Sequence, residues 1–143
     1  MTGRFGSGHI LIDTNASVAF IKRGDAEAVE ILRHADQIGM STAGLGELLS
    51  GFAAGRRETE NWRELGAFLD SARVKLLPVE ADTAEFYSRV YLALRRKGKP
   101  IPTNDLWIAA TVLQHGAAVF SHDQHLHEVD RLIAGTQLAG FLL

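Results

Sequence analysis

Three aspartates occur where an apolar run ends or where a helix is expected to begin, and together they point to a divalent metal site. Asp13 directly follows the run His9–Ile12, Asp123 follows Ala117–Phe120 after two further residues, and Asp105 opens the helix expected before that second run. If the runs are parallel strands, the loops after them and the start of the intervening helix share one edge of the sheet. Two carboxylates about 4 Å apart repel by on the order of 4 kcal/mol at an effective dielectric near 20, which a bound cation would offset. Each aspartate taken alone is equally well explained as a helix cap.

Glu47 is the fourth acidic candidate, and its helical neighbours set it apart. On a helical wheel of residues 41–55 it lies opposite an apolar stripe made of Leu45, Leu48, Leu49 and Phe52. Its own side of the wheel carries mostly small residues, namely Ala43, Gly44, Ser50, Gly51 and Ala54. An exposed helix face would favour Lys, Glu or Gln at such positions, and small neighbours leave room for a substrate backbone. Two interpretations stay open, a solvated helix glutamate and a residue of the metal site.

Three histidines near the C-terminus raise the alternative of a zinc site. His122, His125 and His127 lie close together, but their spacings are not the i, i+4 pair of a helical site, and the chain has no cysteine to complete a ligand set. The acids are therefore the stronger metal candidates, and the role of the histidines stays open. Two basic clusters, Arg56–Arg57 and Arg95–Lys99, are explained either as solvated helix ends or as phosphate-binding groups.

Strands that alternate with helices are needed to bring these acids together. The apolar spacing predicts helices over residues 16–23, 25–38 (closed by Gly39), 41–55, 62–69, 82–96 and 103–114. The predicted strands are residues 9–12, 74–77 and 117–120, with a short strand at best at Met40 and an edge strand over 138–143. Because none of these strands alternates polar and apolar residues, we expect a parallel sheet covered on both faces, that is, an α/β fold.

Composition sets the remaining limits. The chain has 143 residues, 46% hydrophobic and 22% charged, which suits one globular domain over residues 9–143 after a flexible Gly-rich leader, residues 1–8. No run of about 18 apolar residues indicates a membrane helix, and no signal-peptide apolar region is present, so a cytoplasmic protein is the default expectation. A net charge of -2 argues against a protein that binds nucleic acid by phosphate neutralisation alone.

Four segments carry a family resemblance, which covers nearly the whole chain. They are Ile10–Asn15 (ILIDTN), the Gly- and Leu-rich helix around Glu47, Pro102–Ala110 (PTNDLWIAA) and Ser121–Leu126 (SHDQHL). In this order and at these separations they resemble the PIN-domain ribonucleases, in particular the VapC toxins of bacterial toxin–antitoxin pairs. The segment Asn104–Ala110 is the part of this pattern that is most specific to the family. Ser121–His122 departs from the family pattern, in which a Thr and a basic residue are more usual.

The resemblance implies both a fold and a reaction. The fold would be a PIN-like sandwich whose central parallel sheet of about five strands is flanked by helices. The reaction would be endonucleolytic cleavage of RNA, with transfer RNA as one candidate substrate, by water activated on Mg²⁺ or, as a substitute, Mn²⁺. The implied catalytic and metal-binding residues are Asp13, Glu47, Asp105 and Asp123. The residues implied to support these ligands are Thr14, Asn15, Asn104 and Ser121.

The resemblance also implies partners. They are a cognate VapB-type antitoxin, a second copy of the chain in a homodimer, and a heterotetramer or larger assembly with the antitoxin. The antitoxin would lie on helical grooves that include Phe52, Trp62, Leu65 and Phe68, unless these side chains belong to the core.

Two other functions are weighed against this one. A non-catalytic PIN-like module that binds RNA or protein would not need mutually repelling carboxylates. A phosphatase of the haloacid dehalogenase type, with Asp13 as nucleophile, would need a second acid two residues later, where this chain has Asn15.

Overall fold

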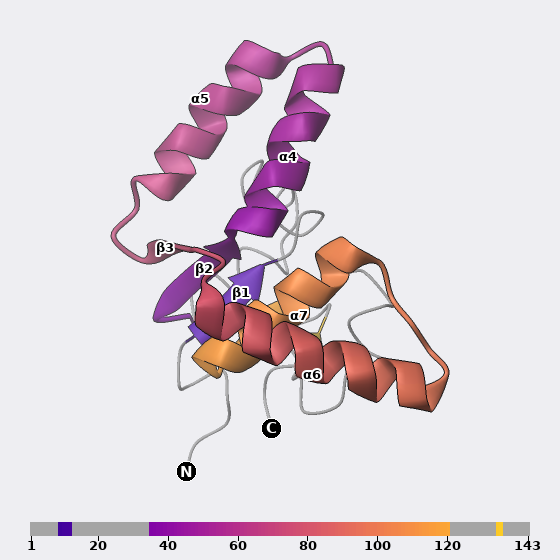
Figure 1. Ribbon diagram of the computed structural model, residues 1–143. Coiled ribbons are helices and arrows are strands. Elements are labelled where there is room, and N and C mark those ends of the chain that lie inside the picture. The colour runs from indigo at the N-terminus through magenta and orange to yellow at the C-terminus, as the bar shows by residue number, and fades with distance from the viewer. Residues whose placement is uncertain (1–8, 13–34, 121–133, 136–143) are drawn as a thin grey trace.

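The computed structural model describes residues 9–12, 35–120 and 134–135, and its centre is a parallel sheet (Figure 1). The strands are β1 (His9–Ile12), β2 (Gln37–Ser41), β3 (Val74–Leu77), β4 (Ala118–Phe120) and β5 (Ala134–Gly135). They lie side by side in the order β3-β2-β1-β4-β5, and every neighbouring pair is parallel. The α/β class and the sheet of about five strands expected from the sequence are confirmed.

Four helices accompany the sheet in the described part of the chain. They are α4 (Thr42–Ala54), α5 (Glu58–Leu69), α6 (Ala81–Lys97) and α7 (Thr103–His115). Figure 1 shows α4 and α5 as a hairpin that extends away from the sheet, whereas α6 and α7 lie across it. All four helices follow the predicted ranges within a few residues. None of the helices described is long and apolar enough to cross a membrane.

Successive residues of β1 enter two separate cores. Ile10 and Ile12 pack in a cluster with Leu48 of α4 and Leu65 of α5. Leu11, between them, packs in a second cluster with residues of α6 and α7, among them Val90, Leu94, Ile108 and Val112. Because successive side chains of a strand point to opposite faces, this short apolar run supports helical layers on both sides of the sheet.

The prediction of a helix over residues 25–38 is wrong at its C-terminal end. Ala35 and Asp36 are not helical, and β2 begins at Gln37, so that Gly39 lies inside a strand and does not close a helix. The strand is stabilised from both sides, because it pairs with β1 and with β3. Ile38 and Met40 are each only 1% exposed. A short central strand that is buried on both faces does not alternate polar and apolar residues. Its sequence therefore lacks the usual strand pattern, and the strand is recognised only from its pairing with β1 and β3.

Helices α6 and α7 are tied together at one end and diverge at the other. At the joined end the hydroxyl of Thr83 donates a hydrogen bond to Oε1 of Gln114. The same hydroxyl oxygen accepts the backbone N–H of Glu80 at 3.0 Å, which completes a capping box at the start of α6. At the other end the loop 98–102 leads from α6 to the start of α7 (Figure 1). Several predicted elements, namely the leader 1–8, the helix 16–23 and the edge strand 138–143, lie outside the described residues.

Candidate metal and active site

Helix α4 is positioned by the last residue of β2. Ser41 ends the strand, and its hydroxyl accepts a hydrogen bond from the backbone N–H of Gly44 at 2.9 Å. This N-cap starts α4 at the carboxyl edge of the sheet. Glu47 follows in the second turn and is partly buried, so it is not the fully solvated glutamate of the simplest interpretation.

Asp105 lies in the first turn of α7, at the same edge of the sheet. Because α7 leads into the parallel strand β4, its N-terminus points to the carboxyl ends of the strands, where α4 begins (Figure 1). The two helices are in contact with each other. Asp105 is only 8% exposed, whereas its neighbour Asn104 is exposed. A carboxylate near a helix N-terminus is stabilised by the helix dipole, which lowers the cost of this burial.

The strand order changes direction at β1. The chain runs outward from β1 in both directions, to β2 and β3 on one side and to β4 and β5 on the other. Such a switch in strand order is where open parallel sheets bind ligands, outside the carboxyl ends of the strands. Ile12 and Phe120, the last residues of β1 and β4, are paired, and in the sequence they directly precede Asp13 and Ser121.

The described residues therefore bring two of the four predicted acids, Glu47 and Asp105, onto contacting helices. The other two, Asp13 and Asp123, lie outside the described residues, as do Thr14, Asn15, Ser121 and the histidines at 122, 125 and 127. Among the residues described, no group of three or more His, Asp or Glu side chains forms a metal site. The ligand set of four acids remains a prediction. Its donors are all carboxylate oxygens, which suit the hard cations Mg²⁺ and Mn²⁺.

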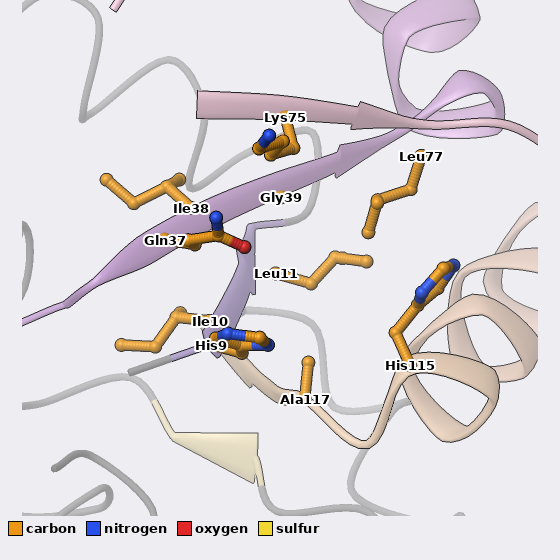
Figure 2. A pocket seen from close by; sticks show the side chains of 10 residues that line it. All are labelled: His9, Ile10, Leu11, Gln37, Ile38, Gly39, Lys75, Leu77, His115 and Ala117. Carbon is orange, nitrogen blue, oxygen red and sulfur yellow. The ribbon is translucent and has the colours of Figure 1, made fainter. Parts of the chain in front are cut away.

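A small cavity of about 190 Å³ lies elsewhere, at the amino ends of β1 and β2 (Figure 2). Its lining includes His9, Gln37, Lys75 and His115. Gly39 leaves part of the space open, because a Cβ there would lie 2.8 Å from Cδ1 of Leu77. Since the predicted acids belong to the opposite edge of the sheet, this cavity is separate from the candidate site.

A second cavity, of about 320 Å³, is close to the candidate site. It is lined by Tyr87, Tyr91 and Arg95 of α6 and by Ile101, Thr103 and Leu106 on the way into α7. The sequence had indicated the basic cluster that begins at Arg95, but it had not indicated the two tyrosines. Tyr87, Tyr91 and Arg95 are spaced four residues apart, so their side chains lie along one face of a helix. That spacing is the sequence signal that would have identified the two tyrosines.

Comparison with known proteins gives a consistent set of relatives. Residues 10–132 match the family model described as the PIN domain. The chain is 27% identical over 95 residues to a protein named ribonuclease VapC5 from Mycobacterium tuberculosis, covering 66% of this chain and 70% of the relative. It is 28% identical over 116 residues to ribonuclease VapC1 from Haemophilus influenzae, covering 79% of this chain and 85% of the relative.

A solved structure has the same fold. It is a structure of VapBC2 from Rickettsia felis bound to a DNA fragment from the promoter, and the similarity has a TM-score of 0.77. The match covers 89% of this chain and 97% of the other at 24% identity, so it supports the fold alone.

Proposed function

Because the chain belongs to the PIN domain family, we propose that it is an endoribonuclease that requires Mg²⁺ or Mn²⁺. The family match spans residues 10–132, which include all four predicted acids. The observation that carries the proposal is the position of Asp105, in the first turn of α7 at the carboxyl edge of the sheet, on a helix in contact with the helix that carries Glu47. Carboxylate oxygens gathered at such an edge are the hard ligands that Mg²⁺ and Mn²⁺ prefer.

In this proposal the residues fall into two groups, those that hold the cation and those that orient the carboxylates. Asp13, Asp105 and Asp123 hold the cation, and Glu47 holds it directly or through a water. When bound, the cation supplies water of lowered pKa and neutralises charge on the phosphate. Hydrogen bonds from neighbouring polar residues orient the carboxylates, and those residues are Thr14, Asn15, Asn104 and Ser121. The products carry 5′-phosphate and 3′-hydroxyl ends.

We further propose that the protein is the toxin of a type II toxin–antitoxin module. The support is that the relatives it matches are named ribonuclease VapC. A VapB-type antitoxin then inhibits the ribonuclease. The chain itself forms a homodimer, and with the antitoxin a heterotetramer or larger assembly. Co-expression with a VapB-type antitoxin, followed by size-exclusion chromatography, tests this partnership.

The test of the reaction is cleavage of RNA by the purified full chain. Wild type with Mg²⁺ or Mn²⁺ cleaves RNA, whereas EDTA, Asp13→Ala and Asp105→Ala each abolish cleavage. Asp70→Asn, an exposed change at the end of α5, leaves it intact. Sequencing the ends produced from cellular RNA decides between transfer RNA and other substrates. Full activity of the two aspartate variants in EDTA would overturn the proposal, and binding of RNA without cleavage would indicate a non-catalytic module.

A further inference from the structure

The diverging ends of α6 and α7 leave a groove beside the candidate site. Its volume, about 320 Å³, is at the lower end of the range of small-molecule sites, about 300–1,000 Å³. Leu106, which is 5% exposed, and Ile101 contribute apolar surface, and Thr103 lies at its rim. Thr103 and Leu106 flank Asp105 in the first turn of α7. The groove and Asp105 therefore share the first turn of α7, within roughly 5 Å along the helix axis, while Asp105 projects from the helix about 100° away from Leu106.

Aromatic rings form one side of this groove. Tyr87 packs on Trp107 of α7, with ring centroids 4.2 Å apart and an angle of 37° between the planes. This contact fixes Tyr87 between the two helices. Tyr91, one turn further along α6, is 45% exposed although it is a large aromatic residue. An exposed ring beside a fixed one is a suitable surface for stacking a flat apolar group.

Arg95 adds a positive charge that the same ring holds in place. Its Nη1 donates a hydrogen bond to the hydroxyl of Tyr91 at 2.7 Å. Its guanidinium carbon lies 5.9 Å from the centre of the Tyr91 ring. A guanidinium has five N–H donors, so this bond leaves it able to donate to a phosphate as well.

The charge around the groove is positive. Residues 95–103 contain Arg95, Arg96, Lys97 and Lys99 and no Asp or Glu. Three of these cations belong to the last turn of α6, and the N-terminus of α7, the positive end of its dipole, follows at Thr103. A chain with a net charge of -2 thus has a local cationic region where α6 ends and α7 begins.

We propose that this groove binds one unpaired nucleotide of the RNA substrate, with its base stacked on Tyr91 and its phosphate on Arg95. The inference rests on the proposed ribonuclease function and adds to it a binding subsite beside the cleavage site. Proteins that hold single-stranded nucleic acid combine stacking platforms with cationic side chains in this way. A duplex has no free base to stack here, so the groove selects single-stranded segments or loops.

The test measures binding separately from cleavage. A fluorescently labelled single-stranded RNA of about 12 nucleotides is titrated with the full chain in EDTA and again with Ca²⁺, and anisotropy gives the Kd. The variants are Tyr91→Ala, Tyr91→Phe and Arg95→Ala. Matched controls lie on the same helix outside the groove: Leu92→Ala, an exposed apolar residue, and Arg89→Ala, whose guanidinium lies over the Phe86 ring. Circular dichroism and size-exclusion chromatography accompany each variant.

The expected results differ between variants. Tyr91→Ala raises the Kd about tenfold, whereas Tyr91→Phe, which keeps the ring, changes it less than about twofold. Arg95→Ala weakens binding and lowers the slope of log Kd against log salt by about one. Leu92→Ala and Arg89→Ala stay within about twofold of wild type. A labelled duplex of the same sequence binds more weakly than the single strand.

Four results would overturn the inference. The first is a wild type that binds no RNA, and the second is a Kd unchanged in both Tyr91→Ala and Arg95→Ala. The third is a loss of RNA affinity in Arg89→Ala equal to that in Arg95→Ala. The fourth is a fall of apparent mass in Tyr91→Ala, which would make this face a contact between copies of the chain. A wild type that binds as expected but cleaves nothing with Mg²⁺ would refute the ribonuclease and leave the groove supported. A wild type that cleaves while its groove variants bind unchanged would refute only the groove.

Discussion

The hydroxyl of Ser41 accepts the backbone N–H of Gly44 at 2.9 Å, so one residue both ends a central strand and caps the helix that carries Glu47. Ser41 is 1% exposed, and its strand lies between β1 and β3. This polar contact helps to position α4, and with it Glu47, at the carboxyl edge of the sheet. Loss of that contact affects both the stability of the fold and the geometry of the candidate site.

Replacing Ser41 with Ala should lower the free energy of unfolding by about 1 kcal/mol, because the N–H of Gly44 loses its cap. Urea denaturation followed by circular dichroism measures the change. Ser50→Ala is the matched control, since Ser50 lies exposed on the same helix and its hydroxyl donates only to the carbonyl of Gly46. That variant should stay within about 0.5 kcal/mol of wild type. Equal effects of the two substitutions would argue against the capping role.

Thr83→Val should destabilise the protein by about 1–3 kcal/mol, because the hydroxyl that links α6 to α7 is removed without a large change of volume. Thr83 is fully buried, and Oε1 of Gln114 and the N–H of Glu80 lose a partner together. Thr111→Val is the comparison: Thr111 is equally buried, but its hydroxyl donates only to the carbonyl of Trp107 within the same helix. Thermal and urea unfolding should rank Thr83→Val as the more damaging. The reverse order would contradict a role in joining the helices.

The sequence predicted the fold where local signals and tertiary structure agree. The range 103–114 was recognised as a helix because Asp105 follows a Pro–Thr–Asn start and Gly116 ends the pattern, and α7 does end there, with Gly116 in the left-handed region at φ 61°. Residues 37–41 were largely missed as a strand because their stability comes from pairing with β1 and β3, which leaves no periodic signal.

The candidate site was predictable only in part. The type and position of Asp105 indicated an acid at the carboxyl edge, and the structure adds that this acid is buried on a helix in contact with α4. A helical wheel could not show what lies opposite Glu47, since that depends on how helices pack. The groove at Tyr91 was missed because it arises from the divergence of two helices around the loop 98–102.

Metal binding should be measurable without any RNA. Because a ligand that binds only the folded state stabilises it, Mn²⁺ at about 100 times its Kd should add roughly 2.7 kcal/mol and raise the Tm by several degrees. Asp105→Asn keeps the shape of the side chain but removes a charged ligand, so its Tm should no longer respond to Mn²⁺. Asp70→Asn, an exposed residue at the end of α5, controls for weak surface binding and should respond as wild type does. An unchanged Mn²⁺ response in Asp105→Asn would remove Asp105 from the metal site.

Glu47→Gln separates the two interpretations of that residue. If the carboxylate holds the cation directly or through a water, loss of its charge weakens metal binding. The cleavage rate at low Mg²⁺ should then fall by about 10- to 100-fold and recover in part as Mg²⁺ is raised. Glu85→Gln, an exposed carboxylate on α6, is the control and should leave the Mg²⁺ dependence unchanged. Rates for both variants are measured against Mg²⁺ concentration on one RNA. A Glu47→Gln profile that superimposes on wild type would mean that this partly buried residue supports only the helix and takes no part in metal binding.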